Sequence, residues 1–168
     1  MLSEKLLAEL NLQMKYEFYS SHLYLAYAGY AYKEDLEGFA NFFIVQAEEE
    51  KFHAMKFFNY IQEMDGIIDF DALEKPNVDF NNITELMVAS LEHEKFVTSR
   101  IYTLMDIATE EKEYATISFL KWFIDEQVEE EATFKSLISK IKRAKDNPVL
   151  LYDVDAEMST RVFTPPTK

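Results

Sequence analysis

The sequence contains no cysteine among its 168 residues, and it has only three glycines and four prolines. Without cysteine, disulfide bonds, thiolate metal ligands and thiol nucleophiles are excluded. The four prolines lie outside the stretches that have helical periodicity: Pro76, Pro148, Pro165 and Pro166. Their positions favour long, uninterrupted helices.

Basic residues are also scarce. Lys and Arg number 17 against 31 Asp and Glu, for a formal net charge of -14. A broad basic surface for nucleic-acid phosphates is therefore not expected. No apolar run is long enough for a membrane span. The first residues, "MLSEKLLAELN", are typical of a helix start capped by Ser3 and not of a signal peptide, so we expect a cytoplasmic protein.

Apolar residues recur at steps of three and four in four long series, as in amphipathic helices. A shorter apolar stripe follows Asn147 and Pro148, where a fresh helix start is expected. We predict helices at about 3–32, 36–64, 82–109, 112–144 and 148–158, followed by an irregular tail at 159–168. The sequence predicts a single domain over residues 1–168.

The connections predict how these helices are arranged. Residues 32–38 and 108–114 form short links, so each pair of helices is expected to be an antiparallel hairpin. Residues 65–82 are longer and, at about 3.3 Å per residue, can run the length of a helix. The prediction is an all-α fold: an antiparallel up-down-down-up four-helix bundle with a long crossover and a short fifth helix.

Seven polar side chains fall on the predicted core faces: Glu17, Gln46, Glu50, His53, Glu94, Gln127 and Glu130. Buried carboxylates are costly unless they are paired or bind a metal. Glu17 and Glu50 are 33 residues apart and centred on the first short link, and Glu94 and Gln127 are equally spaced about the second. In a hairpin, residues equidistant from the turn lie at the same height, so the set is expected to converge at one depth.

The pattern resembles a two-metal site. Carboxylate-bridged di-metal bundles use one Glu from each of two helices and Glu-x-x-His from each of the other two. Here one half has Glu50-x-x-His53, and the other has Gln127-x-x-Glu130. Oxygen ligands with a single imidazole suit Fe(II) or Mn(II) better than tetrahedral zinc. We expect a tighter site from Glu17, Glu50 and His53, and a looser one from Glu50, Glu94 and Glu130 beside Gln127.

Over essentially its whole length the chain resembles the bacterial non-haem ferritins. The segments that carry the resemblance are "LNLQMKYEFYSSHLY", "QAEEEKFHAMKFFNYI", "EHEKFVT" and "FLKWFIDEQVEEEATFKSLI". The Gln-x-x-Glu motif distinguishes these ferritins from haem-containing relatives, which have Glu-x-x-His in both halves. Those relatives place a haem-ligating Met directly after the first motif's Glu. Lys51 stands at that position, so haem is not expected.

The resemblance implies an iron storage protein and a ferroxidase. Fe(II) would be oxidised by O2 or H2O2 and deposited as a ferric mineral within a hollow shell of 24 subunits. The implied di-iron centre comprises Glu17, Glu50, His53, Glu94, Gln127 and Glu130, with Tyr24 and Trp122 beside it. The implied third iron site comprises Glu49, Glu126 and Glu129, with Glu130 shared. From the residues alone, these three acids suit an ordinary acidic surface equally well.

Three alternatives remain open at this point. A di-iron enzyme would keep about two metal ions and form no mineral. A helical interaction module would have solvated acids and bind no Fe(II). A miniature ferritin-like shell that protects DNA is disfavoured by the predicted fifth helix and by the absence of a basic tail. His22 and His93 have no comparable acidic partners at helical spacing, and we interpret them as structural.

Overall fold

A computed structural model of the protein describes residues 2–166. Within them are five helices and no strand: α1 (Glu4–Lys33), α2 (Glu37–Glu63), α3 (Ile83–Glu110), α4 (Tyr114–Arg143) and α5 (Pro148–Met158). Their bounds differ from the predicted ones by at most two residues. The predicted tail is irregular from Arg161 to Pro166, and its last two residues lie outside the described part of the chain.

Local capping explains where the helices begin. The Ser3 side chain accepts a hydrogen bond from the Leu6 N–H at the start of α1. Asn82 caps α3 in the same way, and Asn147 caps α5, whose first residue is Pro148. These side chains satisfy amide groups that have no partner within the helix.

Two short turns close the helix hairpins. Asp35 follows α1 and Lys112 follows α3, both with positive φ. The next residue in each turn donates a backbone hydrogen bond to the end of the preceding helix. The Leu36 N–H donates to the Ala31 carbonyl at 2.9 Å, and the Glu113 N–H donates to the Ala108 carbonyl at 2.8 Å. This pattern ends a helix sharply. The chain therefore reverses direction within a few residues, and each pair packs antiparallel.

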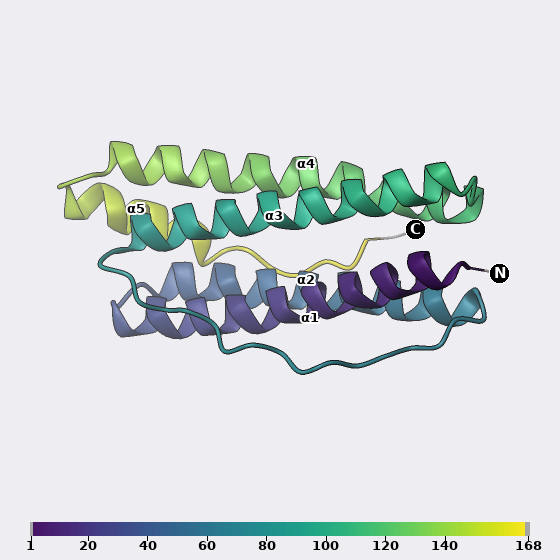
Figure 1. Cartoon of the computed structure of the whole chain (residues 1–168). Helices are drawn as coiled ribbons and strands as arrows, with labels where there is room; N and C mark the ends of the chain where they lie inside the picture. Colours follow the sequence, from purple (N-terminus) through teal and green to yellow (C-terminus); the bar gives the residue numbers. More distant parts are fainter. Residues whose placement is uncertain (1, 167–168) are drawn as a thin grey trace.

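The crossover between α2 and α3 runs along the outside of the bundle, as Figure 1 shows. It is tied to α1 by Lys15, whose Nζ lies 2.7 Å from Asp71 and 3.1 Å from Glu74, and by the Asn11 side chain. Because the crossover spans the full bundle length, α3 runs parallel to α2 and antiparallel to α1. The predicted up-down-down-up order is confirmed.

The apolar core is divided into two clusters along the bundle axis. One surrounds Tyr27, Phe43 and Phe134, and the other surrounds Leu10 and Phe57. Between these clusters, all four long helices place polar side chains in the interior. The candidate site occupies this polar layer.

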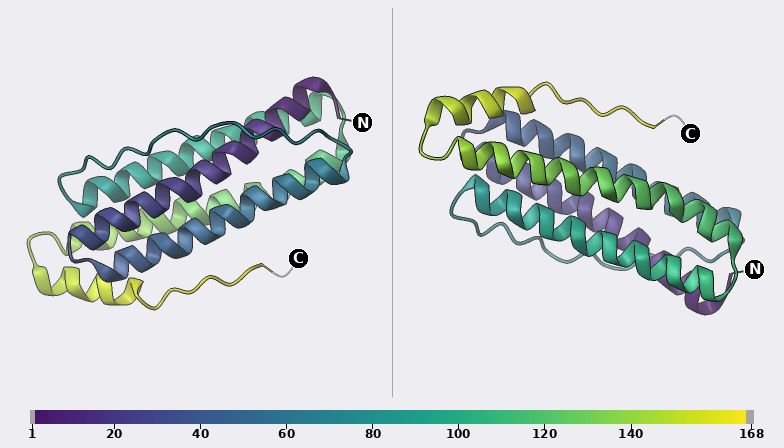
Figure 2. Two further views of the ribbon diagram at one scale, coloured as in Figure 1. Left: turned by 90° about the horizontal axis from the view of Figure 1, so that it is seen from below. Right: turned by 90° about the horizontal axis from the view of Figure 1, so that it is seen from above.

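Helix α5 packs beside α2 at one end of the bundle, and the chain after it returns along the bundle (Figure 2). Among the described residues, no helix is apolar and long enough to cross a membrane.

Candidate metal centre

The polar layer brings together side chains from all four long helices. Each is at most 5% exposed: Glu17 from α1, Glu50 and His53 from α2, Glu94 from α3, and Gln127 and Glu130 from α4. Helical periodicity directs each of them inward, and the two hairpins place them at one depth. Candidate metal ligands from four helices are thus brought together within one chain.

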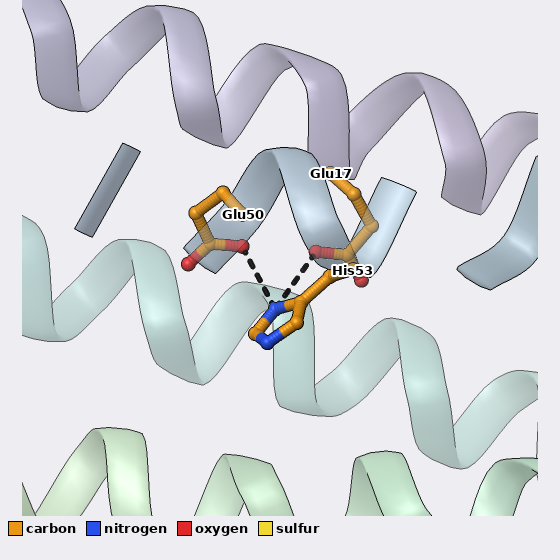
Figure 3. Close-up of side chains that lie close together, drawn as sticks. All are labelled: Glu17, Glu50 and His53. Carbon is orange, nitrogen blue, oxygen red and sulfur yellow. Dashed lines mark hydrogen bonds and ion pairs between the residues drawn. The ribbon is translucent and has the colours of Figure 1, made fainter. Parts of the chain in front are cut away.

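The first group comprises Glu17, Glu50 and His53, whose candidate ligand atoms lie within 4.8 Å of one another. His53 Nδ1 is 3.3 Å from Glu50 Oε2 and 3.9 Å from Glu17 Oε2, and Figure 3 shows the two carboxylates converging on this ring. One helical turn separates Glu50 from His53, so both can contact one ion.

One oxygen in this group lacks a hydrogen-bond donor within residues 2–166. Glu17 Oε1 accepts from the Gln13 side-chain amide at 2.9 Å, whereas the buried Oε2 has no hydrogen-bond partner among the described residues. A buried, unsatisfied carboxylate oxygen is costly. Its position beside Glu50 and His53 fits a bound cation, to which this oxygen would be a ligand.

The other half of the site holds its carboxylates with neutral donors. The Tyr24 hydroxyl donates to Glu94 Oε1, and the Gln127 amide donates to Glu94 Oε2 at 3.2 Å. The Gln46 amide donates to Glu130 Oε2 at 2.7 Å, and its nitrogen lies 3.4 Å from Glu50 Oε1. These donors orient the acids without adding a competing positive charge.

Burial disfavours the charged form of these acids. It raises the pKa of Glu17, Glu50 and Glu130 well above the usual range, and neighbouring carboxylates raise each pKa further. The pKa of Glu94 is raised mainly by burial, against the lowering effect of hydrogen bonds from Tyr24 and Gln127. A bound divalent cation would favour the ionised carboxylates and displace protons.

A second group of candidate ligand atoms comprises His53, Glu126 and Glu130, again within 4.8 Å. Glu126 is half-buried, and burial raises its pKa. His53 and Glu130 therefore connect the interior site to an acid nearer the surface.

The remaining residues of the implied third site are not brought into either group. Glu49 is partly buried and forms an ion pair with Arg161, and Glu129 is exposed. The sequence reasoning missed Arg161 because it lies in the irregular tail, where no periodicity indicates its orientation. The sequence predicts that Gln46 faces the core, but it does not predict that Gln46 contacts Glu130.

Aromatic rings surround the site. The Trp122 ring lies 5.3 Å from the His53 ring, with Lys56 Nζ 4.4 Å above the indole. Tyr24 is fully buried, and burial raises the pKa of its phenol well above the usual range. The Tyr24 hydroxyl is therefore held as a neutral donor to Glu94.

The other two histidines lie outside the candidate ligand groups. His22 is exposed, and His93 is held by the Ser20 hydroxyl at 2.7 Å. Burial lowers the pKa of His93 to about 4, so its ring is neutral near pH 7.

Comparison with known sequences identifies the family. Residues 7–144 match the sequence model of the ferritin-like domain. The chain is 49% identical over 163 residues to a bacterial non-heme ferritin of Staphylococcus aureus, covering 97% of this chain and 98% of the relative. The chain belongs to the bacterial non-haem ferritins. A ferritin of Staphylococcus epidermidis with the same description is 47% identical over the same shares.

Solved ferritin structures agree closely with the fold. A closed form of the Archaeoglobus fulgidus ferritin, engineered by mutagenesis, superposes with a TM-score of 0.96 at 38% identity, covering 98% of this chain and all of that one. A humanized archaeal ferritin gives 0.97 at 39% identity, with the same coverage. The predicted family and ferritin-like bundle are confirmed.

Proposed function

We propose that this chain oxidises Fe(II) to Fe(III) at a centre within its own four-helix bundle and stores the ferric product inside a hollow shell. Its membership of the bacterial non-haem ferritins supports iron storage. The observation that carries the ferroxidase assignment is the buried group of Glu17, Glu50 and His53, in which one Glu17 oxygen has no hydrogen-bond donor among the described residues.

The donor set supports a proposal of two adjacent Fe(II) positions. Glu17, Glu50 and His53 would hold the first ion. Glu50, Glu94 and Glu130 would hold the second, with Gln127 close by. Carboxylate oxygens with one imidazole suit Fe(II), which retains a higher coordination number than structural zinc.

The charge of this set matches the substrate better than the product. When ionised, the carboxylates of Glu17, Glu50, Glu94 and Glu130 balance two Fe(II) ions, whereas His53 and Gln127 add no negative charge. Each Fe(II) gives up one electron, and the pair, together with two protons from solvent, reduces O2 to H2O2, or H2O2 to two water molecules. Two Fe(III) ions then exceed the charge of their ligands, which favours release of iron with solvent-derived hydroxide.

A third iron position beside this centre is part of the proposal. Glu126 and Glu130 already converge with His53, which supports a path from the interior towards the acidic side of α2 and α4. Glu49 and Glu129 would join it only after their side chains move, because Glu49 is paired with Arg161 and Glu129 is exposed.

The assembly and location are also proposals. The agreement with ferritin structures supports self-assembly, for which we propose a 24-subunit shell in the cytoplasm. The proposed function involves no haem, because Lys51 stands where haem-containing relatives have their Met ligand. It involves no nucleic acid, because the net charge is -14.

Aerobic iron loading tests the proposal. Fe(II) would be added at a few hundred ions per subunit, and the protein peak from size exclusion would be assayed for iron. We expect a large particle that holds far more than two irons per chain. A small particle with about two irons would instead indicate a di-iron enzyme, and an iron-free peak would remove the metal assignment.

The centre itself is tested with Glu50→Gln, which keeps the side-chain size but removes a shared ligand charge. We expect the initial rate of Fe(II) oxidation to fall by about 10²-fold, since charge stabilisation at a metal site contributes several kcal/mol. Glu48→Gln is the matched control, because Glu48 is an exposed acid on the same helix. Equal loss in both variants would contradict the assigned role of Glu50.

A further inference from the structure

The C-terminal segment, residues 159–166, is held against α2 beside the candidate centre (Figures 1 and 2). The Asn41 side-chain amide donates to the carbonyls of Met158 at 3.1 Å and Arg161 at 2.9 Å. Further along, the Phe163 ring lies 6.3 Å from the Phe52 ring. The segment therefore lies against α2 both at Arg161 and two residues beyond it.

Arg161 directs its guanidinium towards the centre. Nη2 lies 2.5 Å from Glu49 Oε2, Nη1 lies 2.8 Å from Gln46 Oε1, and the group stacks 4.4 Å from the Phe42 ring centre. The Arg161 and Glu49 side chains are 24% and 23% exposed, so water screens this ion pair only in part. The Arg161 guanidinium is thus paired with the Glu49 carboxylate, which would be a ligand at the proposed third iron position.

The contact with Gln46 extends this effect into the site. Because a guanidinium only donates hydrogen bonds, Gln46 must turn its carbonyl oxygen towards Arg161. Its amide nitrogen then faces Glu130 Oε2 at 2.7 Å and Glu50 Oε1 at 3.4 Å. One buried side chain therefore links the C-terminal segment to two proposed iron ligands.

We propose that Arg161 is a positioning residue whose ion pair with Glu49 keeps this carboxylate from binding metal. An ion that reaches the third position then has to displace the guanidinium from Glu49. This inference rests on the proposed function, because it assigns Glu49 to a path leading from the di-iron centre. Arg161 and a divalent cation compete for the same carboxylate, so Arg161 lowers cation affinity at Glu49 and leaves the first two positions available.

Binding of Co²⁺, which is stable in air, tests the competition without iron oxidation. Calorimetric titration would compare the wild-type protein with Arg161→Gln, which removes the charge but retains a side chain that can pack on Phe42. We expect two tight ions per chain in both proteins, and a third ion bound about tenfold more tightly by the variant, which is the effect of one lost charge-assisted hydrogen bond.

Two further variants separate this effect from a general change of charge or folding. Arg143→Gln removes an arginine whose guanidinium donates a hydrogen bond to Ser139 and, among the described residues, forms no ion pair, and this variant should bind Co²⁺ as the wild type does. Arg161→Gln combined with Glu49→Gln should lose the gained affinity for the third ion. Thermal unfolding and size exclusion would show that each variant folds and assembles.

An unchanged third binding constant in Arg161→Gln would overturn the inference while leaving the proposed function intact. Gained affinity that persists when Glu49 is also replaced, or that occurs in Arg143→Gln, would overturn it too, because Glu49 would not be the group released. No Co²⁺ binding by any of these proteins would overturn the proposed function and this inference together.

Discussion

Glu50 is the residue that the two proposed iron positions share. It contacts His53 in its own helix, and burial together with the Glu94 charge raises the pKa of its carboxyl. In the iron-free protein, closely spaced acids in a dry interior oppose one another. The clustering of acids that suits this site to a cation would therefore lower the stability of the protein when no cation is bound.

Replacing Glu50 with Gln should stabilise the iron-free protein at alkaline pH. A carboxyl with a raised folded-state pKa stabilises the fold below its unfolded pKa, and that contribution is lost as the pH rises through the folded value. Gln does not titrate, so the gain in Tm should be small near pH 5 and reach about 3 °C at pH 8, or ~1 kcal/mol.

Calorimetry of chelator-treated protein at the two pH values measures this difference, with Glu48→Gln as the exposed control. A lower Tm for Glu50→Gln than for the wild type at pH 8 would show that the carboxylate is satisfied without a metal. Saturating Co²⁺ should reverse the order, because only the wild type retains the full ligand set.

At the scale of the elements, the attachment of α5 decides where the C-terminal segment lies. The Phe39 N–H donates to the Asp155 side chain at 2.9 Å. Gly38 allows the close approach, since a Cβ built there would lie 1.6 Å from the Asp155 carbonyl oxygen. The helix and the segment that carries Arg161 therefore depend on the absence of a side chain at position 38.

Gly38→Ala should displace α5 and free the C-terminal segment. We expect a loss of about 1–3 kcal/mol in stability, as for an overpacked core, and faster hydrogen exchange over residues 148–166. Gly29→Ala is the control, because a Cβ at that exposed helical position would have, apart from the adjacent backbone of its own helix, no atom of the described residues within 4 Å. It should stabilise α1 by up to about 1 kcal/mol. Unchanged exchange in Gly38→Ala would contradict the role given to this contact.

At the scale of the whole molecule, charge dominates the surface. The net charge of -14 would be repeated in every subunit of the proposed shell. Such a field concentrates cations near the protein and repels anions. It also opposes assembly, so contacts between subunits have to offset the repulsion. Exposed apolar side chains such as Ile67, Leu25 and Tyr32 are available for such contacts.

Iron uptake should therefore weaken as salt rises. Between ~20 and ~300 mM NaCl, we expect the initial rate of protein-catalysed Fe(II) oxidation to fall several-fold, because the Debye length shortens to under about 10 Å. Stopped-flow absorbance at fixed pH measures the rate, and oxidation in protein-free buffer is subtracted at each concentration. A rate independent of salt would mean that long-range attraction does not limit entry.

The sequence by itself determined the helices and the depth of the polar layer. Helical periodicity is local, so each core face could be predicted from residues a few positions apart. Glu17 and Glu50 are related by one short turn, and counting from that turn was enough to place them together. Glu94 and Gln127 follow the same logic. The family resemblance rested on these same motifs.

Only the tertiary structure decided which groups hold the acids in place. Arg161 contacts Glu49, which lies 112 residues earlier in the sequence, and Gln46, which lies 115 residues earlier. The segment that carries Arg161 has no periodicity. The pairing of Gln46 with Glu130 likewise depends on how two hairpins pack. Contacts between distant segments depend on the packing of the whole chain, and no local spacing determines them.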